Sequence, residues 1–284
     1  MQTCYYKYFG FIFLATITFF LPLIVCSQEI VTLNKDKPYT RIGKSVFYLT
    51  DSERKLSFDE IRTSAMSSKF IKSEQEANNL GNKDMAVWNY FTIYNPTNEN
   101  WLLQVESYNV DTLEFYYPDS ATGQYKKVIS GRYLPFSKRK YKSTYHVFDL
   151  PAAINDTSTF YLKVDTYYMQ YPLSIITRSE FVAEAHRRDL FTGIYYGLVI
   201  VFMIYNFFVF LSVRDKDYLY YVVYIFFNAI LIAQLKGFTA ELYGDRFHFL
   251  WNYAPGIIAI TSIVSFIFTR RILETRTRDR KSVV

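Results

Sequence analysis

The sequence predicts a mainly β extracytoplasmic domain, an antiparallel β-sandwich or jelly roll, followed by α-helical transmembrane segments. Residues 30–180 contain about eight short runs rich in Val, Ile, Tyr, Phe and Thr, separated by turn residues such as Asn95-Pro96. Residues 190–269 contain three charge-free apolar runs. Each run is close to the length of about 20 residues that a helix needs to cross a bilayer. An apolar N-terminal segment precedes both regions and indicates export.

The first 27 residues are predicted to be a signal peptide. Lys7 gives a short positive start, Phe9–Val25 is apolar, and a peptidase would cut before Gln28. Two alternatives stay open: a lipid-modified Cys26 and an uncleaved anchor helix. All three place the next domain outside the cytoplasm.

Residues 28–181 are predicted to form the extracytoplasmic β-sandwich. Apolar and polar residues alternate within the runs: Leu113, Phe115 and Tyr117 share one strand face, as half-buried strands require. Two short helices are also expected, Ser57–Arg62 with Ser57 as its cap, and Ser73–Asn79. The candidate strands are Ser45–Thr50, Ala86–Tyr94, Trp101–Ser107, Thr112–Tyr117, Tyr125–Ile129, Thr144–Leu150, Phe160–Asp165 and Leu173–Thr177.

Residues 182–269 are predicted to form a membrane domain. Its three transmembrane helices are expected at about 190–213, 218–235 and 247–269, and the polar stretch Val182–Asp189 should lead into the first as a helix. Residues 270–284 form a basic tail. Since cytoplasmic flanks of membrane spans are enriched in Lys and Arg, this tail is expected inside the cell.

Composition excludes several functions. Nearly all of the formal net charge of +6 lies outside residues 28–190, which fits membrane topology and gives no reason to expect nucleic-acid binding. Cys4 and Cys26 both fall in the N-terminal segment, so the β domain is expected to lack a disulfide scaffold. The three histidines are isolated and no catalytic motif is present, so we expect no enzyme activity, no metal and no cofactor.

Aromatic residues supply the plausible binding chemistry, because sugar rings stack on Trp and Tyr while polar neighbours hold their hydroxyl groups. Trp88, in mid-strand, is expected in the core. Lys138–Lys142 could meet an anionic ligand but is more typical of a solvated loop. The candidate ligand-binding residues, expected on the surface, are Trp101, Tyr116, Arg132 and Tyr133.

Two sets of segments carry a family resemblance. Ala86–Asn95, Trp101–Leu103, Gly131–Phe136 and Phe160–Val164 together resemble the periplasmic domain of the seven-transmembrane receptors with diverse intracellular signalling modules (7TMR-DISM). Gly193–Gly197, Met203–Phe207 and Arg214–Tyr221 resemble the start of the membrane domain of the same family. This sequence has Tyr90 where an arginine is common, and it holds three apolar runs where the family has seven spans.

The resemblance implies a receptor of the bacterial inner membrane with its N-terminal domain in the periplasm. A jelly roll similar to carbohydrate-binding modules would bind a small ligand, and the helices would pass the signal to a cytoplasmic output such as a kinase or cyclase, absent from these residues. The partners expected are the lipid bilayer, a carbohydrate-like ligand, a cytoplasmic signalling protein and a second copy of the chain. Gly193 and Gly197 form a pair of small residues that favours close helix approach, within one chain or between two chains. The alternative is an envelope protein-interaction or assembly module without a small-molecule ligand.

Overall fold

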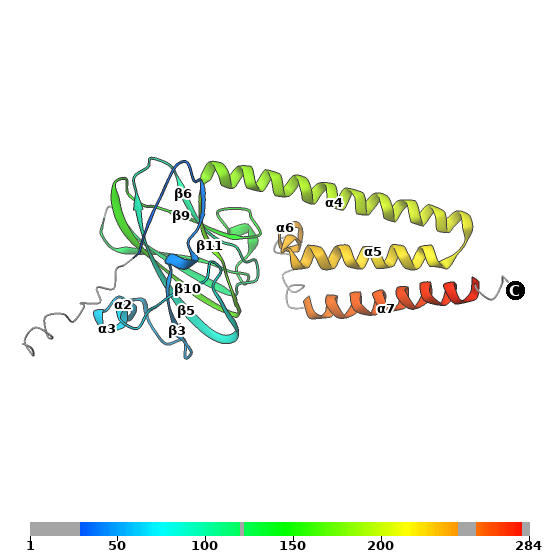
Figure 1. The fold of residues 1–284 in the computed structure, drawn as a ribbon, viewed down its shortest axis with the longest axis horizontal. Helices are drawn as coiled ribbons and strands as arrows, with labels where there is room; N and C mark the ends of the chain where they lie inside the picture. The colour runs from blue at the N-terminus through cyan, green and yellow to red at the C-terminus, as the bar shows by residue number, and fades with distance from the viewer. Residues whose placement is uncertain (1–28, 120–121, 244–253, 280–284) are drawn as a thin grey trace, which may run out of the picture.

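The computed structural model describes residues 29–119, 122–243 and 254–279. A β domain (residues 29–177) lies at one end, and three long helices run away from it (Figure 1). The predicted signal peptide, Cys26 and the start of the third predicted span fall outside the described residues, as do residues 280–284.

Eleven strands form the β domain within the described residues. All eight predicted strands are confirmed; the three others have only two or three residues each, too few for an alternating pattern. The strands are β1 (Ile30–Thr32), β2 (Tyr39–Arg41), β3 (Phe47–Asp51), β4 (Ile71–Lys72), β5 (Asn79–Asn95), β6 (Trp101–Val105), β7 (Thr112–Pro118), β8 (Tyr125–Ser130), β9 (His146–Leu150), β10 (Asp156–Gln170) and β11 (Leu173–Thr177).

The strands make two sheets that pack as a sandwich. The large sheet has the order β4-β3-β5-β10-β7-β8, with β1 joined in parallel to β5; the small sheet has the order β2-β11-β6-β9. Apart from β1 the pairing is antiparallel, as predicted. Side chains such as Phe91, Phe115 and Phe160 from the large sheet meet Leu103 and Ile175 from the small sheet in the main core.

Short helices decorate the β domain: η1 (Gly43–Ser45), α2 (Phe58–Ile61), α3 (Ser64–Ser67) and η2 (Phe136–Lys138). The predicted cap on α2 is confirmed. The Glu60 amide donates to Ser57 Oγ over 3.4 Å and the Ser57 amide donates to Glu60 Oε2 over 2.7 Å, a reciprocal capping box.

The helix predicted at Ser73–Asn79 is wrong. Ser73 Oγ donates to Asn78 Oδ1 over 2.7 Å and the Gln75 amide donates to Ser73 Oγ over 3.3 Å, and these local bonds hold an irregular turn that leads into β5. Ser and Asn side chains compete with helical hydrogen bonds in this way.

The membrane helices are α4 (Arg178–Val213), α5 (Lys216–Leu235) and α7 (Ala254–Asp279), with the short α6 (Phe238–Tyr243) after α5. Within the described residues, three helices are long and apolar enough to cross a membrane. Their surfaces expose large apolar side chains, among them Phe202, Phe208 and Phe266, which suits contact with lipid. Helix α5 packs against both α4 and α7 (Figure 1).

Helix α4 joins the two parts of the protein without a loop. It begins directly after β11, where the Glu180 amide donates to the Thr177 hydroxyl over 3.3 Å, and it continues through residues 182–189 into the first apolar run. It ends at Arg214, whose φ of 62° turns the chain toward the cap of α5 at Asp215. At the same end of the bundle, Arg271 Nε of α7 lies 2.8 Å from Asp217 Oδ1 of α5.

Candidate functional site

A row of four aromatic side chains crosses the outer face of the large sheet. Strand register builds it: Phe47 of β3 pairs with Tyr90 of β5, Tyr90 pairs with Tyr161 of β10, and Tyr161 pairs with Tyr116 of β7. The Phe47 and Tyr90 rings stack with centroids 5.0 Å apart. We call these four residues the aromatic row. Such a row places ring faces side by side on a rigid surface.

One half of the aromatic row is covered by α2. The Phe58 ring stacks on Tyr116 with a centroid distance of 4.1 Å and an interplanar angle of 6°, and it meets the edge of Tyr161 at 5.5 Å. Ile61 of the same helix is buried against the sheet beside Trp88. Helix α2 therefore limits how much of the aromatic row is accessible to a ligand.

The other half of the row lines an open groove of about 390 Å³. Tyr90 and Tyr161 form part of its floor, both only partly buried. Phe70 stands edge-on to Tyr90 with ring centroids 4.8 Å apart. The aromatic groove, as we call it, is lined by Phe47, Ile61, Arg62, Ser67, Ser68, Phe70, Tyr90, Thr159 and Tyr161.

The polar groups of the aromatic groove include one cation and several hydroxyls. Arg62 is exposed, and its guanidinium lies 4.6 Å from the centroid of the Tyr125 ring. Burial raises the pKa values of Tyr125 and Tyr161, so both phenols stay protonated at neutral pH. Ring faces combined with hydroxyl groups and a guanidinium can stack on a sugar ring and hydrogen-bond its substituents.

Trp101 was predicted on the surface, and that placement is wrong. It opens β6 in the small sheet, pairs with Leu150 and Thr177, and is 3% exposed within the main core. Its indole nitrogen donates to Thr97 Oγ1 over 2.8 Å, so the one polar atom of the side chain is already satisfied. Its position at the end of a strand suggested exposure, but the facing sheet covers it.

Tyr116 lies on the sheet face opposite Leu113 and Phe115, as expected, but it is 8% exposed and not a surface residue. Phe58 covers the ring, and the hydroxyl donates to Glu114 Oε2 over 2.6 Å. Trp88 is buried as expected, but in this outer cluster beneath α2 and not in the main core. Tyr116 thus supports the aromatic groove from beneath α2.

Arg132 and Tyr133 lie far from the aromatic row, toward the membrane helices. Arg132 forms an ion pair with Asp111, donates to Asn109 Oδ1 over 3.0 Å, and stacks its guanidinium 4.9 Å from the Tyr133 ring centroid. Arg132 also lines a cavity of about 600 Å³ that Leu231 and Pro255 of the membrane helices close from the other side. The four predicted residues therefore do not form one site.

The histidine and lysine-rich features have local roles. His146 is buried, with Nδ1 2.9 Å from Ser130 Oγ. In the Lys138–Lys142 run, Arg139 donates to the Ser143 carbonyl over 3.1 Å, and Lys142 donates to the Phe136 carbonyl over 3.2 Å. Among residues 29–119, 122–243 and 254–279, no group of three or more His, Cys, Asp and Glu side chains could hold a metal ion.

The β domain also packs on the membrane helices through the α5–α6 turn. Gly237 has a φ of +70°, and a Cβ atom placed there would lie 2.7 Å from Cβ of Tyr108. Tyr108 shares the 600 Å³ cavity with Tyr167 and Tyr168, where the pairing of β10 with β5 becomes irregular. The fold thus has a second contact between its two parts besides α4.

The residues that matter most in the aromatic groove are not among the predicted four. The alternation of apolar and polar residues could place Tyr90 and Tyr161 on the outer face of their strands. It could not predict the strand register that pairs Tyr161 with Tyr90. Arg62 and Phe70 come from the connection between β3 and β5, whose folding onto the sheet has no periodic signal.

Comparison with known families confirms the resemblance found in the sequence. Residues 43–177 match the family described as 7TMR-DISM extracellular 2, and residues 188–283 match the family described as 7TM diverse intracellular signalling. The boundary between the two matches falls in the first part of α4. No curated protein matches the chain.

Proposed function

Because this chain belongs to the 7TMR-DISM family, with the extracellular domain of that family followed by its membrane domain, we propose that it is a receptor whose aromatic groove binds a small carbohydrate-like ligand. Membership makes it a membrane sensor with an N-terminal extracytoplasmic domain. The ligand class, the periplasmic face of a bacterial inner membrane and the route of the signal are our proposals.

The aromatic groove carries the ligand proposal. Tyr90, Tyr161 and Phe70 offer ring surfaces that match the apolar C–H faces of a pyranose, and Arg62 adds guanidinium donors for hydroxyl or carboxylate groups. Ser67 and Ser68 donate their hydroxyl hydrogens to backbone carbonyls and so offer acceptor oxygens to the groove. Aromatic side chains that are already ordered on paired strands lose little conformational entropy when a ligand binds. This low cost helps a groove bind sugars, whose affinity for proteins is usually weak.

Strand β10 provides the route toward the membrane. It carries Thr159 and Tyr161 in the aromatic groove, and seven residues later Tyr168 lines the cavity against the membrane helices. At about 3.3 Å per residue these two points are roughly 23 Å apart on one strand. A ligand that binds one arrangement of β10 better than another would shift α4 and the α5–α6 turn with it.

The output would come from a cytoplasmic module or a signalling partner. The two matched domains are sensory. A second copy of the chain is a further proposed partner. Among the described residues, no atom outside the helix's own backbone lies within 4 Å of a Cβ atom added at Gly193 or Gly197, so small residues there would let another helix approach closely.

One observation favours the second candidate function, a protein-interaction module. Strand β8 is an edge of the large sheet, and its Val128 and Ile129 are 41% and 47% exposed. Exposed apolar edge strands invite pairing with another chain. Cross-linking at β8 in cells that persists without any ligand would favour this function over small-molecule sensing.

The ligand proposal is tested by isothermal titration of the full chain in nanodiscs against soluble oligosaccharide panels. Binding that Tyr90→Ala abolishes and Tyr94→Ala preserves supports it, because Tyr94 lies on the same strand and face but does not line the groove. A panel that yields no binder for the unaltered chain counts against the carbohydrate class.

A further inference from the structure

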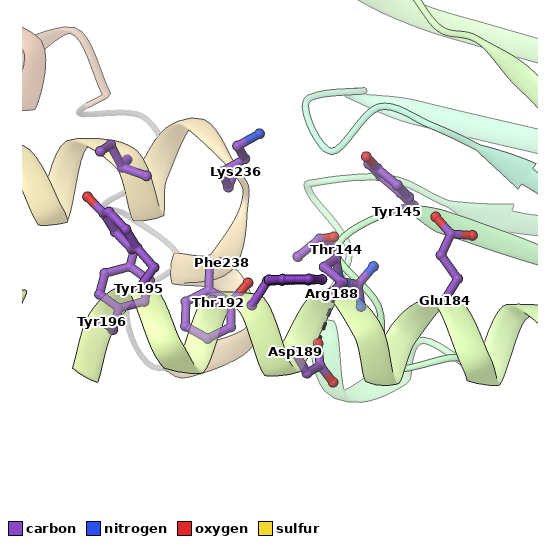
Figure 2. Close-up of a pocket in the computed structure, with 12 residues that line it drawn as sticks. Thr144, Tyr145, Glu184, Arg188, Asp189, Thr192, Tyr195, Tyr196, Lys236 and Phe238 are labelled. Atoms are coloured by element: carbon purple, nitrogen blue, oxygen red, sulfur yellow. Dashed lines mark ion pairs between the residues drawn. The ribbon is translucent and has the colours of Figure 1, made fainter. Parts of the chain in front are cut away.

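A second cavity, of about 490 Å³, lies where the β domain meets the membrane helices (Figure 2). Its walls come from three parts of the chain: Thr144 and Tyr145 before β9, the first half of α4, and the end of α5 with the start of α6. It shares no residue with the aromatic groove. The cavity therefore exists only while the β domain and the helices stay docked.

The cavity is polar at one end and apolar at the other. Figure 2 shows Glu184 and Tyr145 at the end toward the β domain, Arg188 and Asp189 further along α4, and Tyr195 and Tyr196 at the opposite end. The change falls at Leu190, where the charge-free run of α4 begins. That position is the outer boundary expected for the bilayer, where headgroups give way to acyl chains.

Lys236, which follows α5, adds a second cation to the cavity wall besides Arg188. The Tyr196 hydroxyl donates to the Ala229 carbonyl over 3.3 Å and so fixes the alignment of α4 with α5. Arg188 lies eight residues before Tyr196, and Lys236 lies seven residues after Ala229. Because the helices are antiparallel and rise about 1.5 Å per residue, the Cα atom of Arg188 lies about 12 Å from that of Tyr196 toward the β domain, and the Cα atom of Lys236 lies about 10 Å from that of Ala229 in the same direction.

The four charged side chains are weakly engaged with the protein. Arg188 Nε lies 3.6 Å from Asp189 Oδ1, and Arg188 Nη1 lies 3.5 Å from Ser143 Oγ, both long contacts. Within the described part of the chain, the side chains of Glu184 and Lys236 make no hydrogen bond or ion pair with another residue. Two cations and the Glu184 carboxylate thus face the cavity, and few of their hydrogen-bonding groups are used within the protein, while Asp189 points to the other side of α4 (Figure 2).

We propose that this cavity holds the headgroup of a zwitterionic phospholipid from the outer leaflet, one with a phosphate and a primary ammonium. The phosphate meets Arg188 and Lys236. The ammonium, which has three hydrogen-bond donors, meets Glu184, which lies one turn before Arg188 on the same face of α4. The start of the acyl chains lies along Phe191, Tyr195 and Ile232. An anionic headgroup would leave the Glu184 carboxylate unmatched, and a quaternary ammonium could not donate a hydrogen bond to it.

This inference rests on the membrane placement of the helices and not on the carbohydrate ligand. A lipid held there would touch the β domain, α4 and the α5–α6 turn at once. It would therefore stabilise their docked arrangement, since a ligand that binds only the docked form shifts the equilibrium toward it.

The test uses the full chain equilibrated with equal amounts of phosphatidylethanolamine, phosphatidylglycerol and phosphatidylcholine in mixed micelles, with retained lipid counted by native mass spectrometry. We expect about one phosphatidylethanolamine per chain. Arg188→Gln and Lys236→Gln should each weaken its retention about tenfold, the usual effect of losing a hydrogen bond to a charged group. Arg187→Gln is the matched control, because Arg187 is the neighbouring exposed arginine, pairs with Glu180 and does not line the cavity.

A charge-specific variant separates recognition from misfolding. Glu184→Gln removes one carboxylate, so retention should shift from phosphatidylethanolamine toward phosphatidylglycerol, a change of preference that unfolding would not produce. Equal retention of the three lipids, or equal losses in Arg187→Gln and Arg188→Gln, overturns the proposal. Complete displacement of the lipid by an equal concentration of soluble glycerophosphoethanolamine also overturns it, because the site would then recognise a free zwitterion and not a lipid.

Discussion

Gly237 of the α5–α6 turn lies directly against Tyr108 of the β domain, so close that a Cβ on Gly237 would come within 2.7 Å of Cβ of Tyr108. The contact joins two parts of the chain separated by the whole of β7 to α5. Together with the continuous helix α4, it docks the β domain on the membrane helices.

Gly237→Ala should loosen the docking. The substitution adds a clash with Tyr108 and places a non-glycine residue at a φ of +70°, which alone costs about 1–2 kcal/mol. Hydrogen exchange should speed up around Tyr108 and in the α5–α6 turn, with the strands of the large sheet unchanged. Gly193→Ala is the control, because a Cβ there meets nothing within 4 Å. Unchanged exchange at Tyr108 would show that the contact does not hold the two parts together.

Ser57→Ala should uncover the buried half of the aromatic row. It removes the capping box of α2, which costs about 1 kcal/mol, and lets Phe58 leave Tyr116. Because Trp88 lies beneath the same helix, its fluorescence should shift to longer wavelength. Ser64→Ala serves as the control, since Ser64 begins α3, is exposed, and its side chain makes no hydrogen bond within the described residues. An unshifted spectrum in Ser57→Ala would mean that α2 stays in place without its cap.

His146 should make the β domain acid-sensitive. Burial, aided by the nearby positive charge of Arg139, lowers the pKa of His146 to about 3, below its ordinary value of about 6.5 in an unfolded chain. Below about pH 6.5, His146 becomes protonated in the unfolded chain but stays neutral in the folded chain. The free energy of unfolding therefore falls as the pH falls. The slope approaches 1.4 kcal/mol per pH unit between about pH 6 and pH 3.

Chemical unfolding of the β domain, followed in the full chain at several pH values, checks this. His146→Gln should flatten the slope below pH 6.5, whereas the exposed His186→Gln should leave it as it was. Equal slopes in all three proteins would assign the acid sensitivity to other groups.

The eight longer strands and the membrane helices were predictable because each has a local signal. Alternation at Leu113 and Phe115 gave the inward face of β7, and the absence of charge after Asp189 gave the first span. The candidate sites had no such signal. Whether Trp101 or Tyr90 reaches the surface depends on which sheet faces it, and whether Tyr116 is open depends on α2, which comes from a different part of the chain.

The packing of the β domain against the membrane helices could likewise not be predicted from the sequence. Arg132 and Tyr133 follow a glycine and are polar and aromatic, a composition that suits a ligand site as well as it suits an interface. Only the fold places Arg132 beside Tyr108, against Leu231 and Pro255 of the membrane helices. Long-range contacts of this kind follow from register and packing and leave no periodic trace in the residues that make them.

The central claim is that the aromatic groove is the receptor's ligand site. Its most direct test is the heat of binding of the best soluble oligosaccharide to the full chain and to two tyrosine variants. Tyr90→Ala removes a ring from the groove floor, so affinity should fall about tenfold, the effect of losing roughly 60 Å² of buried apolar contact at about 25 cal/mol per Å². Tyr94→Ala should bind as the unaltered chain does. Equal affinity in Tyr90→Ala and the unaltered chain would contradict the account and place the ligand elsewhere.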